Sequence, residues 1–443
     1  MAGVHRPAVS PADSPEEDPV DSRASVEAVW RIESARLVGA LARYTGDFAL
    51  AEDLAQEALA EALVSWPRDG VPDNPAGWLR TVGRRRAIDA FRRRTALEER
   101  YAVLGAELDR GRLDERWEAG LDPEHIDDDV LALVFVSCHP VLSREASIAL
   151  TLRVLGGLTS DEIGRAFLTP TATVQARITR AKKTLAAAQV PFEVPPPEER
   201  RERLGAVLTV LYLIFTEGSS ATSGSEWIRA DLAREAIRQA RVLARLMPGE
   251  PETHGLLALL ELTAARFPAR LADDGRPVLL EDQDRRRWDR SAIRRGRASL
   301  ATAGRIGRGL GAYGLQASIA ECHAVAPSIE ETDWERIVLL YDALLTLTPA
   351  PIIELNRAVA VSMAEGPAHA LPLVDALSDS RQLAGSHLLP GVRGELLTRL
   401  GRIDEARTEL EQALALCSGE RERDVIRDKI ARLDVQGGAD PVS

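Results

Sequence analysis

Hydrophobic and polar positions repeat with a helical period along most of the chain. Between residues 51 and 63 the apolar side chains recur at steps of three and one, which places them in one continuous stripe along a helix. Trp66 and Pro67 predict the end of this helix, and a second helix is expected from Ala76. The period returns at residue 129 and, after a break, dominates residues 201–435, so the sequence predicts an all-α protein. The polar face of the first helix carries acids and an amide: Glu52, Asp53, Gln56, Glu57 and Glu61.

Segments without this period divide the chain. Residues 1–24 are rich in proline and acidic residues and are predicted to be a disordered tail. Residues 96–128 are acidic and weakly periodic, which predicts a linker, and residues 191–200 form a second linker with a run of prolines. The helical domains expected between these breaks span residues 25–95, 129–190 and 201–435, and residues 436–443 form a short tail.

The segment from residue 158 to residue 185 is the most informative part of the sequence. Thr159 followed by Glu162 is a capping box that opens a short helix. Thr169 is expected to cap the next helix, with Pro170 at its first position. That second helix has one apolar side and several basic residues but no acids, so the pair predicts a DNA-binding helix-turn-helix. A helical hairpin with a solvated basic face is the alternative.

Charge is distributed unevenly, although the whole chain has a net charge of −12. Residues 76–94 contain seven arginines and one acid, whereas residues 95–129 contain twelve acids and four arginines. A chain with alternating blocks of charge is expected to meet more than one kind of charged surface. The negative net charge therefore does not exclude a nucleic-acid partner.

Other classes of chemistry have no support in the sequence. The three cysteines and seven histidines show no disulfide or metal-ligand spacing, and no nucleophile motif or phosphate loop is recognisable. No enzymatic activity, catalytic residue, cofactor or metal site is predicted. The first residues lack the apolar core of a signal peptide, and the longest apolar run, residues 207–215, is too short to cross a membrane. These features predict a cytoplasmic protein without a membrane partner.

Two stretches resemble region 2 of the extracytoplasmic-function (ECF) sigma factors of RNA polymerase. They are AEDLAQEALAEALVSW at 51–66 and NPAGWLRTVGRRRAIDAFRRR at 74–94, and the helix-turn-helix downstream resembles region 4 of the same family. The resemblance covers residues 26–190. It implies a region 2 helical bundle in a protein that binds core RNA polymerase, recognises the −10 and −35 elements of promoter DNA and initiates transcription. The family's pattern assigns the contacts to core polymerase to Asp53, Leu54, Gln56 and Glu57.

The resemblance also assigns the promoter contacts. Arg85 stands where the family commonly has asparagine, and Thr169 and Thr171 also depart from the pattern, so promoter sequence preference does not carry over. The −10 element is expected to meet the loop before the arginine-rich helix and the helix itself: Asn74, Trp78, Arg80, Arg84, Arg85, Arg86, Arg92 and Arg93. The −35 element is expected to meet the second helix of the helix-turn-helix: Thr171, Thr173, Gln175, Arg177, Arg180, Lys182 and Lys183.

The C-terminal segment shows weak internal repetition. Gly394, Leu397, Ala406 and Leu410 fit small and apolar positions of a tetratricopeptide repeat, and residues 358, 361, 370 and 374 match them 36 residues earlier. Segments such as LLEDQDRRRW (279–288) resemble a sigma-factor subgroup with a tetratricopeptide-like (TPR-like) extension. The extension is expected to regulate or support activity, with a regulatory protein as a further partner. A plain all-helical domain is the alternative, and the polar cluster between Asp282 and Trp288 receives no role.

Two other functions compete with this one. A helix-turn-helix regulator could act on duplex DNA without polymerase and sense a ligand or peptide through its repeat domain. A scaffold could rely on the repeats alone. The acidic helix at 51–64 and the arginine-rich helix at 76–94 favour the sigma factor, because a plain helix-turn-helix regulator needs neither.

Overall fold

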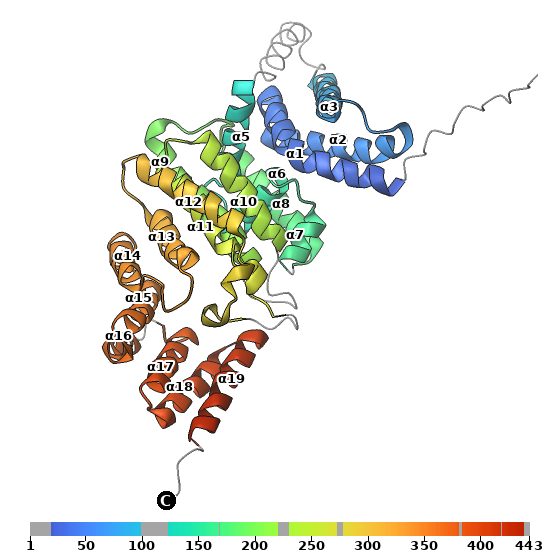
Figure 1. Cartoon of the computed structure of the whole chain (residues 1–443). Helices are drawn as coiled ribbons and strands as arrows, with labels where there is room; N and C mark the ends of the chain where they lie inside the picture. Colours follow the sequence, from blue (N-terminus) through green and yellow to red (C-terminus); the bar gives the residue numbers. More distant parts are fainter. Residues whose placement is uncertain are drawn as a thin grey trace, which may run out of the picture. The chain divides into compact units, whose positions relative to one another are not determined.

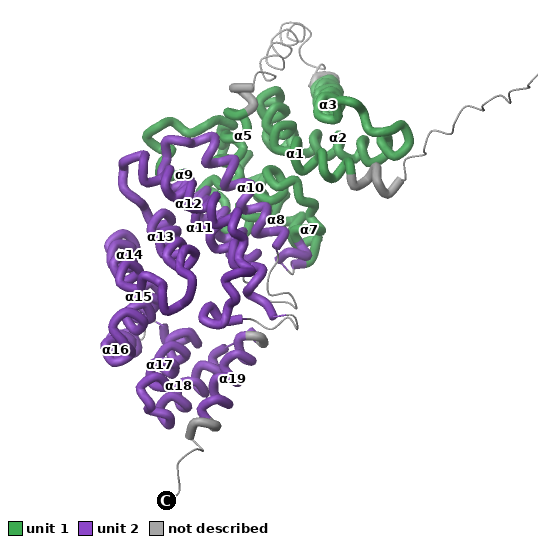
Figure 2. The backbone as a smooth tube through the Cα atoms, viewed as in Figure 1, with its two compact units in different colours: residues 1–163, 170–203 green, residues 164–169, 204–443 purple. Residues whose placement is uncertain are grey.

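The computed structural model describes residues 19–98, 123–167, 169–219, 230–272, 278–380, 383–417 and 419–437. Within these ranges the chain is helical and forms no β-strand, which confirms the predicted all-α class (Figure 1). The chain divides into two compact units (Figure 2). The first comprises residues 1–163 and 170–203, and the second comprises residues 164–169 and 204–443.

The first unit is built around the pairing of its first two helices. Ala51, Ala55, Ala58 and Ala62 on the apolar stripe of α2 are fully buried, and these small side chains let α1 pack closely. Asp47 caps α2 by accepting a hydrogen bond from the backbone N–H of Leu50 at 3.0 Å. The helices of this unit are α1 (Pro19–Thr45), α2 (Phe48–Asp69), α3 (Pro75–Glu98), α5 (Pro123–Ser137), α6 (Arg144–Val154), α7 (Ser160–Ala166, whose last residues belong to the second unit) and α8 (Thr171–Ala187).

Several boundaries differ from the sequence prediction. Helix α1 begins at Pro19, so residues 19–24 are helical and do not belong to a disordered tail. Helix α5 begins at Pro123 inside the predicted linker, and α9 begins at Pro197 inside the second one. Proline is well suited to the first turn of a helix, where no N–H donor is required, so these prolines start helices rather than extend linkers. The acidic stretch 99–122 lies outside the described residues.

Helix α2 also runs past its predicted end. Pro67 lies inside the helix, which ends at Asp69, and the backbone N–H of Gly70 donates to the carbonyl of Trp66 at 3.0 Å. Pro67 has no N–H and so removes one hydrogen bond from the last turn, and the helix ends two residues later.

The second unit continues as a chain of helices, each packed on the next from α13 to α19. Three short 3₁₀ turns at Phe267–Ala269, Leu280–Asp282 and Arg285–Arg287 interrupt the series after α11. The helices are α9 (Pro197–Ser219, whose first residues belong to the first unit), α10 (Ala230–Leu246), α11 (Pro251–Ala264), α12 (Arg290–Arg305), α13 (Ala312–Val325), α14 (Trp334–Leu347), α15 (Pro351–Ala364), α16 (Pro367–Ser380), α17 (Leu388–Arg399), α18 (Ile403–Leu416) and α19 (Glu420–Gly437).

The positions that suggested repeats lie in one core. Leu397, Ala406 and Leu410 are buried in the same core as Ala358 and the other residues of the sequence repeat that lies 36 residues earlier. Gly394 explains the close approach of α17 and α18, because a Cβ built there would come within 2.9 Å of the Leu410 side chain. Consecutive helices thus pack through small residues, and the assignment to the TPR class stays a prediction.

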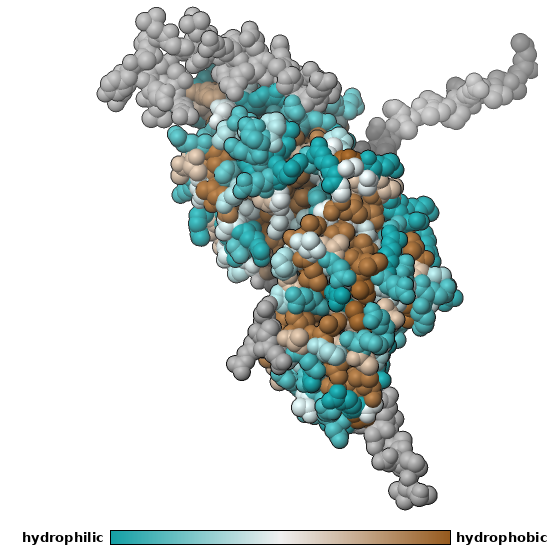
Figure 3. Space-filling model, turned by 90° about the vertical axis from the view of Figure 1, so that its left-hand side faces the viewer, coloured by the Kyte–Doolittle hydropathy of each residue, from teal (hydrophilic) through white to brown (hydrophobic). Residues whose placement is uncertain are grey.

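Part of the second unit carries apolar side chains on its surface. Leu339, Leu347, Ile352 and Leu373, on α14 to α16, are exposed. Figure 3 shows one face of the molecule, where hydrophobic side chains gather between polar ones.

Candidate functional site

The helix-turn-helix is formed by α7 and α8. The predicted capping box is confirmed: the Glu162 carboxylate accepts from the backbone N–H of Thr159 at 2.8 Å, and the Thr159 hydroxyl accepts from the N–H of Glu162 at 3.1 Å. The predicted cap of α8 is wrong. Pro170 occupies the N-cap position, and the Thr169 hydroxyl instead donates to the carbonyl of Phe167 at 3.1 Å.

Helix α8 has one buried side and one exposed side, as the sequence predicts. Val174, Ile178, Ala181 and Leu185 are buried. The side chains expected at the −35 element divide by environment. Thr173, Gln175, Arg180 and Lys183 are exposed, whereas Arg177 is half-buried and the Thr171 hydroxyl donates to Asp161 of α7 at 3.2 Å.

Lys182 does not share this exposure. Its ammonium donates to Glu52 at 2.8 Å and to Asp53 at 2.6 Å, both on α2, and its side chain is 13% exposed. Arg153 of α6 donates to the other oxygen of Glu52 at 3.0 Å. In this arrangement the charge of Lys182 is paired inside the first unit, and its contact with a promoter phosphate stays a prediction.

Glu52 is the centre of this cluster and lies in the interior, although the sequence placed it on the polar face. Its side chain is 4% exposed. Burial alone would raise the pKa of Glu52, but the charges and hydrogen bonds of Lys182 and Arg153 outweigh burial and hold that pKa below its ordinary value. Burial would likewise lower the pKa of Lys182, and the two carboxylates reverse this and raise it.

The rest of the α2 face agrees in part with the predicted polymerase contact. Asp53 and Glu57 are exposed, and Gln56 is half-buried. Leu54 is 1% exposed and packs in the core, so it supports the helix and presents no contact surface. Of the predicted contacts, Asp53 and Glu57 therefore present exposed carboxylates, and these pair with Lys182 and Arg86 respectively.

Two predicted −10 residues of α3 are bound to α2. Arg86 lies 2.8 Å from Glu61 and 3.7 Å from Glu57, and Arg85 also pairs with Glu61. Burial would raise the pKa of Glu61, but its hydrogen bonds to Arg85 and Arg86 lower it. Arg92 pairs within its own helix with Asp89 at 3.6 Å. The remaining predicted arginines are half-buried or exposed on α3: Arg80, Arg84 and Arg93.

Asn74 and Trp78 lie at the start of α3. The Asn74 side chain is exposed, and its carbonyl oxygen accepts from the backbone N–H of Gly77 at 2.9 Å, as a helix cap does. The half-buried Trp78 ring packs edge-on against Trp66, with ring centroids 5.5 Å apart. Both side chains thus have structural partners in addition to any role with DNA.

The sequence assigned no role to the polar cluster between Asp282 and Trp288. In the structure, hydrogen bonds from this cluster attach its loop to the end of α13. Asp284 accepts from the backbone N–H of Arg286 at 3.0 Å and caps the third 3₁₀ turn. Arg285 donates to the carbonyls of His323 at 2.7 Å and Ala326 at 2.8 Å, and its guanidinium lies 4.9 Å from the centre of the Trp288 ring. Helix capping is therefore one role of this cluster.

One group of side chains could offer ligands to a metal, and the sequence spacing did not predict it. His387, Cys417 and Glu422 come from the start of α17, the end of α18 and the first turn of α19, and their ligand atoms lie within 4.8 Å of one another. Their separations in sequence match no familiar metal motif, so only the fold could bring them together.

Among the described residues, no helix is both long and apolar enough to span a membrane.

Three family models match consecutive parts of the chain. Sigma-70 region 2 matches residues 31–96, and sigma-70 region 4 matches residues 133–185. A family of unknown function, DUF6596, matches residues 203–304. The two sigma regions therefore cover α2 and most of α3 and α8, and the third family lies at the start of the second unit.

Two curated proteins are similar to parts or most of this chain. The uncharacterized protein R00370 of Rhizobium meliloti (strain 1021) is 47% identical over 399 residues, which cover 89% of this chain and 93% of that protein. The probable ECF RNA polymerase sigma factor SigI of Mycobacterium tuberculosis is 25% identical over 178 residues, which cover 40% of this chain and 59% of that protein. The chain thus belongs to the family of R00370, and its sigma-70 regions 2 and 4 support an ECF-type sigma factor.

Proposed function

We propose that this protein is an ECF-type sigma factor that binds core RNA polymerase, recognises the −10 and −35 elements of a promoter and initiates transcription. The observation that carries the proposal is the combination of two unlike surfaces in one unit. Helix α2 exposes the carboxylates Asp53 and Glu57, and α8 of the helix-turn-helix exposes Gln175, Arg180 and Lys183. A protein that binds DNA alone has no need of the acidic surface.

Core polymerase is the partner proposed for the acidic surface of α2, which Gln56 borders. Reversing the charge at Asp53 and Glu57 should weaken binding to purified core polymerase without unfolding the protein, because both side chains are exposed. Reversal of Asp231, an exposed acid of α10, is a matched control that should leave binding unchanged. A double variant at Asp53 and Glu57 that binds core as tightly as the parent would remove this assignment.

The promoter contacts follow the exposed groups. Thr173, Gln175 and half-buried Arg177 lie in the first two turns of α8, where side chains of a recognition helix reach base edges, and Arg180 and Lys183 lie later, where they meet phosphates. For the −10 element, the arginines of α3 supply charge for a separated strand, and Trp78 and Asn74 border the loop before it. Run-off transcription with core polymerase on a promoter library tests both contacts.

The second unit is proposed to regulate or support this activity as a TPR-like domain, acting alone or through a regulatory protein. A domain fused to the DNA-binding half acts at high effective concentration and needs no tight intrinsic affinity. Cutting the chain after Arg203, the last residue of the first unit, should lower promoter activity in the run-off assay. Activity above that of the full chain would show instead that the unit is inhibitory.

The competing function is a helix-turn-helix regulator that works without polymerase. It requires the same α8 but gives no role to the carboxylates of α2. Gel filtration of the full chain with purified core polymerase separates the two, because a regulator of that kind elutes apart from the enzyme.

A further inference from the structure

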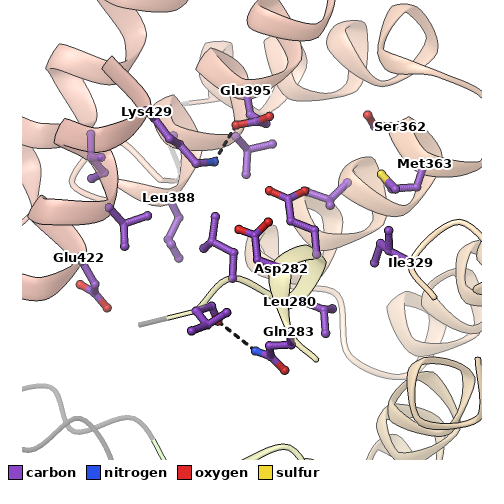
Figure 4. A pocket seen from close by; sticks show the side chains of 18 of the residues that line it. Leu280, Asp282, Gln283, Ile329, Ser362, Met363, Leu388, Glu395, Glu422 and Lys429 are labelled. Carbon is purple, nitrogen blue, oxygen red and sulfur yellow. Dashed lines mark hydrogen bonds and ion pairs between the residues drawn. The ribbon is translucent and has the colours of Figure 1, made fainter. Parts of the chain in front are cut away.

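The second unit contains a cavity of about 940 Å³ that none of the proposed contacts uses. The segment 278–283 and helices α15, α17 and α19 contribute to its walls. Figure 4 shows apolar side chains from several of these elements around the space, among them Leu280, Ile329 and Leu388. The ion pair between Lys429 and Glu395, with a distance of 2.6 Å, lies on another wall. The volume is that of a typical small-molecule site.

Two arginines on the wall of this cavity, Arg266 and Arg270, have no carboxylate partner among the described residues. Arg266 contacts the side-chain oxygen of Gln283 at 3.4 Å, and its guanidinium lies 5.7 Å from the centre of the Trp288 ring. Arg270 donates to the carbonyl of Ser219 at 2.9 Å. Neither guanidinium forms an ion pair with a carboxylate of the described residues. Among the described residues, the groups that hold both guanidiniums are therefore neutral.

A third cation adds to the positive charge of this region. Arg285 lies on the same Trp288 ring, and its Nη2 is buried without a hydrogen-bond partner among the described residues. Burial, together with repulsion from Arg270 and Arg285, lowers the pKa of Arg266 to about 10. Burial and the charges of Arg266 and Arg285 also lower the pKa of His323 to about 4. Holding like charges together in a desolvated place is costly, and a bound anion would offset that cost.

We propose that this cavity binds a small anionic molecule, with a carboxylate or phosphate group against Arg266 and Arg270 and an apolar body against Leu280, Ile329 and Leu388. Guanidinium groups bind such oxyanions through paired N–H donors, which suits both head groups.

The charges on the other walls set the size and class of the ligand. Five acidic residues also line the cavity and would repel a long polyanion such as nucleic acid: Glu281, Asp282, Glu330, Glu395 and Glu422. A molecule with one anionic end and an apolar remainder avoids these carboxylates. The site thus differs in kind from the DNA-binding surfaces of the first unit.

The test uses thermal unfolding of the full chain in chloride, inorganic phosphate, acetate and octanoate at equal ionic strength. The wild-type protein should show a saturable rise in Tm with phosphate or with a carboxylate, since a ligand that binds only the folded state stabilises it. A rise with phosphate alone identifies a phosphate head group. A larger rise with octanoate than with acetate identifies a carboxylate with an apolar body.

Three variants locate the binding. Arg266→Gln and Arg270→Gln should each raise the apparent Kd for the active anion at least tenfold. Arg287→Gln is the matched control, since Arg287 is an exposed arginine of the neighbouring turn and should leave the Kd unchanged. In chloride alone Arg266→Gln should be at least as stable as the wild type, because it removes an unbalanced buried charge.

Two results overturn the proposal. One is a wild-type protein whose Tm shows no saturable rise with either anion class, and this arm needs no variant to fold. The other is a rise that persists unchanged in Arg266→Gln and Arg270→Gln, which would place the anion on the arginines of α3 or α8.

Discussion

Replacing Lys182 by alanine tests whether this side chain belongs to the interior of the first unit. The change leaves the carboxylate of Glu52, 4% exposed, with Arg153 as its remaining partner. Losing one of two charged partners of a buried carboxylate costs about 1–3 kcal/mol, and complete loss would cost about 3–5 kcal/mol. The second contact of Lys182, to Asp53 with 63% of its side chain exposed, adds at most about 1 kcal/mol because solvent screens it. We expect a loss of about 2 kcal/mol in the free energy of unfolding.

Lys183 is the matched control, because it is the adjacent residue of the same type and is exposed. Lys183→Ala should change the free energy of unfolding by less than about 0.5 kcal/mol. Urea denaturation of the full chain, fitted with one transition for each unit, measures both variants. Equal stability of Lys182→Ala and wild type, or equal loss in both variants, would refute the assignment of Lys182 to a buried cluster.

Three further outcomes follow from the structure. Because the pKa of Glu52 is lowered in the folded protein, its ionised carboxylate contributes fully to stability above pH 4.5, the ordinary pKa in the unfolded chain. That contribution is lost as the pH falls through the lowered pKa of the folded state. An acid titration of the wild-type protein should therefore show a loss of free energy of unfolding that Glu52→Gln does not show. Gly394→Ala should destabilise by about 1–3 kcal/mol through its clash with Leu410, whereas Gly391→Ala on the same helix, with its nearest atom at 4.0 Å, should be neutral or stabilising in the same denaturation assay. Gln175→Ala should change which −35 sequences are selected from a library, while Lys183→Ala should weaken binding to all of them and reduce the salt slope by about one.

The sequence predicted features that depend on residues close together along the chain. The apolar stripe of α2, the capping box at Thr159 and Glu162 and the buried side of α8 all follow from local periodicity, and the structure confirms them. The small and apolar residues around Gly394 were predicted in the same way, because their spacing in the sequence matches that of two helices packed against each other.

Features that depend on distant residues were missed. Glu52 lies at the edge of the apolar stripe, and its burial depends on Arg153 and Lys182, which are 101 and 130 residues away in sequence. Leu54 was assigned to a contact surface because a family motif marks a segment and does not separate its buried from its exposed side chains. The arginines of the cavity have no signature in sequence, since the neutral groups that hold them among the described residues are brought together only by the fold.

The ion pairs on α2 bear on how strongly salt should affect binding to a cationic protein surface. Asp53 and Glu57 already hold Lys182 and Arg86, so an incoming cation replaces an existing partner and does not meet a bare carboxylate. Association is then an exchange in which the number of ion pairs changes little, and its dependence on ionic strength should be shallower than the charge of α2 implies. The same exchange would release a lysine and an arginine on the two helices proposed to meet DNA, so occupation of the acidic face and the supply of free positive charge would be linked thermodynamically.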